Sequence, residues 1–200
     1  MKILNLYAGI GGNRKLWKDV EVTAVEINPD IAKIYSDFFP DDEIIVGDAH
    51  QYLLEHYNEF DFIWSSPPCP THSRIRKMNI KQNPPIYPNM ELYEEILLLD
   101  GYVNSKWVVE NVISWYNPLI KPYEVGNHYF WSNFIISELP KSTRCHNASI
   151  NELQNRKGFD LTNKKCPIEK RFILRNCVEP ELGKHIFDCA FRIEQKKIIN

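Results

Sequence analysis

The sequence lacks several features that would place it in a specialised class of protein. Its 200 residues contain no apolar segment of about 18 residues, which excludes a transmembrane helix of ordinary length. The five cysteines form no Cys-x-x-Cys pair, so a disulfide framework is not expected. The first residues lack the small-residue cleavage site of a secretory signal. We therefore expect a cytoplasmic protein with no membrane partner.

A strong excess of one charge is also missing, since the formal net charge is only −2. The distribution is uneven, however. Residues 1–140 hold 11 Lys or Arg and 19 Asp or Glu, whereas residues 141–175 hold nine against three. This basic block is typical of a phosphate-binding surface or of a solvated lysine-rich loop, and charge alone does not choose. Cys145, His146 and Cys166 also lie in it, but without a second close pair of ligands we expect no metal site.

The order of apolar runs predicts the fold class. Strand patterns cover residues 2–8, 20–27, 42–48, 60–66 and 105–112, and helical patterns cover residues 13–20, 28–39, 49–57 and 90–102. This alternation predicts an α/β fold with a mostly parallel, doubly wound sheet. Further along, residues 127–137 are predicted as strand–turn–strand and residues 179–195 as a final helix. Ligands of such sheets bind beyond the carboxyl ends of the strands.

Three of those strand ends carry groups that suit a nucleoside-bearing cofactor. The glycine-rich segment Ala-Gly-Ile-Gly-Gly at residues 8–12 follows the first strand, where it lets the backbone approach a ligand closely. Glu26 ends the second strand and could accept both hydroxyls of a ribose. Asp48 ends the third and could accept from an adenine amino group. NAD and S-adenosylmethionine both fit, and helix N-capping is the alternative for the two carboxylates.

The next two strand ends carry groups typical of catalysis. Cys69 lies in Ser-Ser-Pro-Pro-Cys, where prolines restrict the loop, and a thiol at this edge could ionise near cations. His72, Arg74 and Arg76 lie just downstream as possible cations, although a free cysteine is more often buried and inert. Glu110 ends an apolar run, so a buried carboxyl there could donate a proton or a hydrogen bond, or act as a cap.

Taken in order, seven segments of the chain resemble motifs of the cytosine-5 DNA methyltransferases. They read LYAGIGG, VEINPDIAKIY, GDA, SSPPCPTHS, VVENV, HYFWSNF and RNCVEPELGKHIF, with Tyr7 standing where the family usually has Phe. The resemblance spans about residues 3–134 and 171–190. It implies a sheet of the S-adenosylmethionine-dependent methyltransferase (Rossmann-like) type. Residues 1–134 would be the catalytic and cofactor-binding domain, residues 135–170 a reduced basic target-recognition region, and residues 171–200 a segment returning to the catalytic domain.

The resemblance also implies roles for single residues. Cys69 would add to C6 of a cytosine flipped out of double-stranded DNA, Glu110 would hold or protonate N3, and His128 would help hold the base. The residues implied to bind S-adenosylmethionine are Tyr7, Ala8, Gly9, Gly11, Gly12, Glu26, Ile27, Asp48, Ala49, Pro68, Asn176 and Cys177. The residues expected to contact nucleic acid are Ser73, Arg74, Arg76, Lys164 and Lys165.

Three departures from the family pattern qualify these expectations. Pro70 follows the catalytic cysteine where Gln is usual, and His128 stands where Arg is expected. The recognition region is also short, so we expect a short or relaxed target sequence or a separate recognition subunit. The small size would suit a phage or mobile element in a bacterial cell, with or without a paired restriction enzyme.

Three other functions remain open at this point. The first is the same chemistry on RNA, as in tRNA methyltransferases of this fold. Methylation of an amino group of cytosine or adenine is disfavoured, because those enzymes carry an aromatic residue in place of Cys69 and do not need Glu110. The last is a non-catalytic module that binds nucleic acid, which His128 and Pro70 favour and the intact Cys69 and Glu110 oppose.

Overall fold

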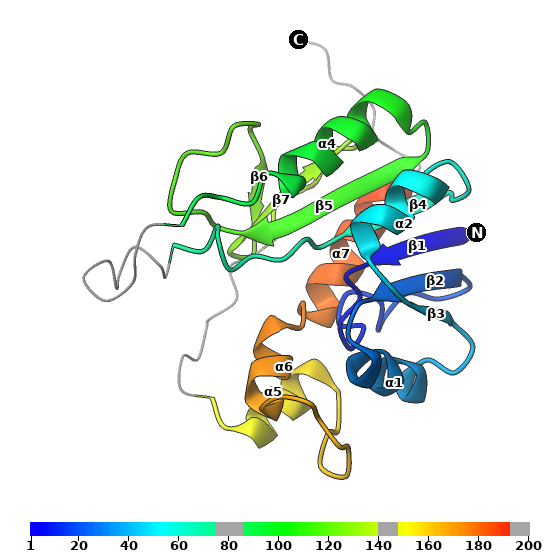
Figure 1. Ribbon diagram of the computed structural model, residues 1–200, viewed down its shortest axis with the longest axis vertical. Coiled ribbons are helices and arrows are strands. Elements are labelled where there is room, and N and C mark those ends of the chain that lie inside the picture. The colour runs from blue at the N-terminus through cyan, green and yellow to red at the C-terminus, as the bar shows by residue number, and fades with distance from the viewer. Residues whose placement is uncertain (75–85, 140–147, 193–200) are drawn as a thin grey trace.

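A computed structural model describes residues 1–74, 86–139 and 148–192 of the chain (Figure 1). The strands are β1 (Lys2–Leu6), β2 (Glu21–Glu26), β3 (Glu43–Val46), β4 (Phe62–Ser65), β5 (Lys106–Val112), β6 (Tyr123–Val125) and β7 (His128–Ser132). The helices are α1 (Pro29–Phe38), α2 (Ala49–His56), α4 (Glu91–Tyr102), α5 (Ile150–Lys157), α6 (Lys170–Asn176) and α7 (Pro180–Phe191). No helix in these ranges is long and apolar enough to cross a bilayer.

The strands form one seven-stranded sheet in the order β3-β2-β1-β4-β5-β7-β6. Strands β1 to β5 pair in parallel, while β7 runs antiparallel to β5 and β6 antiparallel to β7. From β1 the chain moves outward to β3 and then returns to β4 on the other side of β1, so the strand order reverses there. Such a switch point opens a ligand-binding crevice at the carboxyl ends of the strands. The predicted α/β class with a mostly parallel, doubly wound sheet is confirmed.

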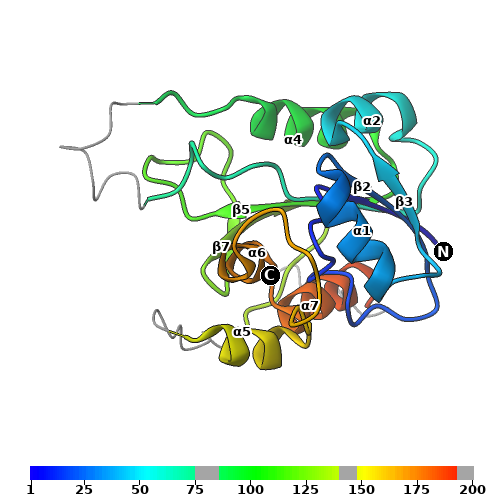
Figure 2. The ribbon, with the colours of Figure 1, turned by 60° about the horizontal axis from the view of Figure 1, so that its bottom comes forward.

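Helices cover both faces of the sheet, with α2 and α4 on one side and α1 and α7 on the other (Figure 2). The alternation of side chains along β2 explains both layers. Val22 packs in the cluster that includes Ile186 of α7, whereas Val25 packs in the cluster that includes Leu53 of α2 and Leu99 of α4. A strand buried on both faces reads as a continuous apolar run, as the sequence does.

Helix α1 begins as its sequence predicts. The side chain of Asn28 caps the helix by accepting two first-turn N–H groups at 3.0 and 3.2 Å, and Pro29 opens the first turn. The buried positions Ile31, Ile34 and Tyr35 are spaced three and four residues apart. This helix therefore joins β2 to β3 with its apolar stripe toward the protein interior.

The predicted helix over residues 13–20 is wrong, because the structure has only turns there. Trp17 is 4% exposed, stacks on Phe187 with ring centroids 5.2 Å apart, and donates from Nε1 to the carbonyl of Gly183 at 3.3 Å. Contacts with α7, about 170 residues further along the chain, thus decide the local path.

The strand–turn–strand predicted over residues 127–137 is wrong in register. The turn comes earlier, at Gly126 and Asn127, whose φ angles are 57° and 74°. It joins β6 to β7, so the aromatic run forms the second strand of the hairpin. Asn127 is one of the few non-glycine residues that tolerate this left-handed conformation.

The basic block contributes to the core of the protein. A capping box between Ser149 and Glu152 starts α5, a helix that the weak periodicity of this region does not predict. Leu153 and Phe159 pack in one cluster with Ile34 of α1. The described part of this region thus shares its core with Ile10 and with α1.

Candidate active site

The turn after β1 brings the glycine-rich segment against the end of β2. Gly9 has φ 55°, and its backbone N–H donates to Oε2 of Glu26 at 3.0 Å. A Cβ built on Gly9 would meet nothing within 4 Å. The backbone at Gly9 therefore has open space beside it, as close approach of a ligand requires.

The other two glycines of the segment have a different reason to be glycine. A Cβ on Gly11 would lie 2.3 Å from the ring of Phe39, and one on Gly12 would lie 2.3 Å from the carbonyl oxygen of Val178. Both positions are filled by neighbouring parts of the chain. Gly11 and Gly12 therefore permit close packing, and direct contact of either residue with a cofactor stays a prediction.

The two carboxylates at the ends of β2 and β3 differ in their local roles. Oε1 of Glu26 accepts from the N–H of Asn28 at 2.9 Å, and since Asn28 is the cap of α1, the capping alternative for Glu26 is wrong. Asp48 does cap α2, accepting from the N–H of Gln51 at 3.0 Å. A carboxylate has about four lone-pair sites, so both groups can still accept from a ligand.

The remaining positions of the cofactor edge are mixed in exposure. Ile27 is 69% exposed and Pro68 and Asn176 are also exposed, whereas Ala8 and Ala49 are buried. Open backbone at one glycine, two carboxylates at successive strand ends and an exposed apolar side chain beside them fit a nucleoside-bearing cofactor such as S-adenosylmethionine.

Cys177 lies behind the glycine-rich segment. Its Sγ would be 2.4 Å from a Cβ on Gly12, and it packs in the same cluster as Ile10. Burial raises the pKa of the Cys177 thiol to about 12. The thiol thus supports the segment from inside, and contact of Cys177 with the cofactor stays a prediction.

The loop that carries Cys69 is fixed to β5 and to the chain beyond it. The side-chain amide of Asn111 donates to the carbonyl of Pro67 at 3.0 Å. Trp115 donates from Nε1 to the carbonyl of Thr71, also at 3.0 Å. Within the loop, the carbonyl of Cys69 accepts from two backbone N–H groups at 3.0 and 3.1 Å, which closes a tight turn. The loop after β4 is thus held on both sides of Cys69.

The electrostatic surroundings of Cys69 differ from the prediction. Burial first, and then the charge of Glu110, raise the pKa of the Cys69 thiol. His72 is no cation here, because it is 1% exposed, its burial lowers its pKa, and its Nδ1 lies 2.6 Å from the hydroxyl of Tyr116. Arg74 is exposed. Arg76 lies outside the described residues.

Glu110 and His128 meet across two neighbouring strands. Glu110 is 7% exposed on β5, and its Oε1 is hydrogen-bonded to Nδ1 of His128 at the start of β7. An ionised Glu110 can only accept, so Nδ1 carries the proton whenever Glu110 is a carboxylate. The structure therefore brings Cys69, Glu110 and His128 together, since Glu110 acts on the thiol and contacts the imidazole.

The residues expected to bind nucleic acid differ in exposure and in the partners that they already have. Nζ of Lys164 is 2.6 Å from Oδ2 of Asp37 and 5.4 Å from the ring centre of Phe38. Lys165 is exposed and takes part in no ion pair among the described residues. Ser73 belongs to the Cys69 turn through its N–H. Lys164 is thus partly neutralised, which leaves Lys165 the better candidate for a phosphate contact.

Other cations of the basic block are paired inside the protein. Arg156 and Lys157 both contact the carboxylate of Glu179. Cys145 and His146, which we weighed as part of a metal site, lie outside the described residues.

One functional candidate escapes the sequence analysis. Glu95 of α4 is fully buried and accepts hydrogen bonds from Tyr7 and Ser65, at the ends of β1 and β4. A signal was present, because Leu92 and Leu99 place position 95 on the apolar stripe of its helix. A carboxylate on such a stripe needs a partner in the interior.

Known proteins match part of the chain. Residues 1–87 match the family model for C-5 cytosine-specific DNA methylases, a range that includes Cys69 but ends before Glu110 and His128. A tRNA (cytosine(38)-C(5))-methyltransferase from Spodoptera frugiperda is 33% identical over 129 residues. That match covers 60% of this chain and 38% of the relative, so the chain spans well under half of that protein's length.

Solved structures give similar partial matches. A crystal structure of a DNMT2 variant from Spodoptera frugiperda is 32% identical, covers 56% of this chain and 35% of that one, and has a TM-score of 0.39. A putative DNA modification methyltransferase encoded within a prophage of E. coli is 14% identical and covers 77% of this chain and 54% of that one, with a TM-score of 0.44.

Proposed function

We propose, starting from the match of residues 1–87 to the family model for C-5 cytosine-specific DNA methylases, that this protein methylates C5 of cytosine in DNA. The methyl donor of the family is S-adenosylmethionine, which supplies an electrophilic methyl group when bound. The observation that carries the proposal is the hydrogen bond from Asn111 to Pro67, because it holds the Cys69 loop beside the strand that bears Glu110.

Each catalytic residue has a defined step in this reaction. The Cys69 thiolate forms a bond from Sγ to C6 of a flipped-out cytosine, while Glu110 donates to N3 and takes up the negative charge that develops there. C5 then carries the electron pair that accepts the methyl group. Loss of the C5 proton to water, return of the N3 proton to Glu110 and departure of Sγ as a thiolate restore the aromatic ring.

The raised pKa of Cys69 gives the substrate a part in activating the nucleophile. Glu110 must carry a proton to donate to N3, and a protonated Glu110 no longer opposes a thiolate at Cys69 through its charge. Binding of cytosine would thus remove one of the two causes that keep the thiol protonated. The other cause, burial, remains.

Cytosine in tRNA is the second candidate substrate. It is favoured by the Spodoptera frugiperda relative, whose name gives a tRNA as the molecule methylated. The catalytic steps would be the same. Because the recognition region is short and several of its cations are paired internally, we also propose that a separate subunit could supply target recognition for double-stranded DNA.

Transfer of a labelled methyl group to duplex DNA and to tRNA, side by side, tests the proposal. The wild type should label DNA, Cys69→Ala should label nothing, and Cys166→Ala should match the wild type because Cys166 lies outside the Cys69 loop. Duplexes with 5-fluorocytosine should trap the wild type covalently. Label only on tRNA would favour the second substrate, and none on either would favour a non-catalytic binding module.

A further inference from the structure

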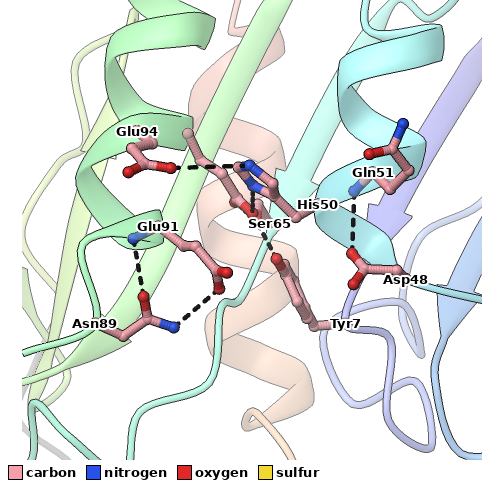
Figure 3. Close-up of polar contacts among 9 residues, drawn as sticks. Tyr7, Asp48, His50, Gln51, Ser65, Asn89, Glu91 and Glu94 are labelled. Atoms are coloured by element: carbon pink, nitrogen blue, oxygen red, sulfur yellow. Dashed lines mark hydrogen bonds and ion pairs between the residues drawn. The ribbon is translucent and has the colours of Figure 1, made fainter.

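A buried carboxylate on α4 gathers side chains from three other elements. Glu95 is 0% exposed, and its two oxygens accept from the hydroxyls of Tyr7 and Ser65, each at 2.5 Å. Nδ1 of His50, on α2, lies 3.2 Å from the same oxygen as Tyr7. Figure 3 shows the side chains of Tyr7, His50 and Ser65 converging from β1, α2 and β4.

The cluster lies at the switch point of the sheet. Leu6 and Ser65 are partners in the parallel pairing of β1 with β4, so Tyr7 follows directly beyond the carboxyl end of β1. The strand order reverses between these two strands, which is where a doubly wound sheet binds its ligand. Glu95 is therefore hydrogen-bonded to side chains at both strand ends that border the crevice.

The backbone of Tyr7 requires such stabilising contacts. Its φ is 55°, a left-handed conformation that costs a non-glycine residue energy, and it opens the turn to Ala8 and Gly9. A Phe in place of Tyr7 would have no hydroxyl to donate to Glu95. The hydroxyl of Tyr7 and the carboxylate of Glu95 thus form one feature of this chain, 88 residues apart in sequence.

We propose that Glu95 is a positioning residue of the cofactor site, which holds Tyr7 in its left-handed conformation and so sets the path of the backbone at Gly9 beside the cofactor. The inference rests on the proposed function, because that function assigns the crevice to S-adenosylmethionine. Glu95 is fully buried, so it acts through Tyr7 and Ser65.

A purely structural role of Glu95 predicts a different result. A buried carboxylate satisfied by three donors also stabilises the fold, so its loss lowers stability whether or not it positions anything. Leu99 provides the matched comparison, because it is fully buried on the same helix and its apolar side chain takes no part in the hydrogen bonds of Tyr7 and Ser65. Its replacement by Ala lowers stability through a cavity and leaves the cluster intact.

The test measures the Kd of S-adenosylmethionine without nucleic acid, by calorimetry, together with Tm. Glu95→Leu should raise Kd by about tenfold because it leaves buried hydroxyls unpaired. Glu95→Gln should stay within about threefold, since an amide can accept from Tyr7 and donate to Ser65. Tyr7→Phe should raise Kd by about threefold, and the double variant Tyr7→Phe with Glu95→Leu should bind no more weakly than Glu95→Leu alone.

Two results overturn the positioning role. One is wild-type cofactor affinity in Glu95→Leu. The other is an equal rise of Kd in Leu99→Ala at a matched loss of Tm. If Glu95→Leu does not fold, Tyr7→Phe decides, with its Kd compared with that of Leu99→Ala. A wild type that binds no S-adenosylmethionine would sink the proposed function and this role together, whereas binding without methyl transfer to DNA or tRNA would sink only the proposed function.

Discussion

The imidazole of His128 is hydrogen-bonded to the carboxylate of Glu110, and the two groups reach each other from neighbouring antiparallel strands. The same carboxylate raises the pKa of the Cys69 thiol. Protonation of any one of the three groups therefore changes the charge that the other two experience. His128 of this pair stands where the resemblance to the cytosine-5 DNA methyltransferases implies an arginine.

Replacing His128 by Arg should change the pH dependence of methyl transfer. Histidine side chains change charge between about pH 5 and 8, whereas Arg stays cationic. The rate of His128→Arg relative to the parent should therefore be higher at pH 8 than at pH 6. Equal ratios at both pH values would show that the charge at position 128 does not matter.

Replacing Glu110 by Gln should lower the pKa of Cys69. The carboxylate is the second cause of the raised pKa after burial, so its removal makes the thiolate easier to form while burial still disfavours it. Alkylation of Cys69 by iodoacetamide, followed by mass spectrometry across a pH series, should show its midpoint at lower pH in the variant. Glu124→Gln, an exposed carboxylate on β6, is the control and should leave the midpoint in place.

The elements that the sequence predicts well are those fixed by local signals. The cap at Asn28 and Pro29 begins α1 because its hydrogen bonds lie within the first turn. The apolar runs of β1, β2, β4 and β5 form strands because each is buried on both faces, whereas β3 at the edge of the sheet is only partly buried. Trp17 shows the limit of local reasoning, since its contacts with α7 replace the helix that its surroundings predict.

The candidate site divides in the same way. Cys69 and Glu110 could be placed at strand ends from the sequence, but their electrostatics could not. His72 follows Cys69 by three residues and suggests a cation, yet its ring turns to Tyr116, which lies 44 residues further along the chain. The partner of Glu95 is 88 residues away at Tyr7, beyond the reach of any sequence pattern.

Gly12→Ala and Gly9→Ala should differ in how they affect stability and cofactor affinity. At Gly12 the new Cβ would lie 2.3 Å from a backbone carbonyl, so unfolding free energy should fall by about 1–3 kcal/mol through overpacking. At Gly9 the Cβ has room, and the left-handed φ costs about 1–2 kcal/mol. For the same decrease in Tm, Gly9→Ala should therefore lose more S-adenosylmethionine affinity than Gly12→Ala. The reverse order would mean that Gly12 is the residue that faces the cofactor.

Stability should fall as pH rises through the titration of His50. The hydrogen bond to Glu95 is the main reason that the pKa of His50 is raised, and the charges of Glu95, Glu91 and Glu94 add to it. A raised folded-state pKa gives stability that is fully present below the unfolded value of about 6.5 and is lost above the folded one. Urea unfolding between pH 6 and 8.5 should show this decline, and His50→Gln should flatten it.

The control for that series is His56→Gln on the same helix, because His56 pairs with Glu59 and not with Glu95. It should keep the decline of the parent. A decline of the same size in His50→Gln would assign the pH dependence to other groups.

The two lysines at 164 and 165 should contribute unequally to nucleic-acid binding. Each phosphate contact that is lost changes the slope of log K against log salt by about 0.9 on duplex DNA. Lys165→Ala should flatten the slope by about that amount, whereas Lys164→Ala should flatten it less, because Lys164 already pairs with Asp37. Lys184→Ala is the control, since Lys184 pairs with Asp188 on α7. Binding measured between 50 and 200 mM salt decides, and an unchanged slope in the Lys164→Ala, Lys165→Ala double variant would remove this part of the basic block from the interface.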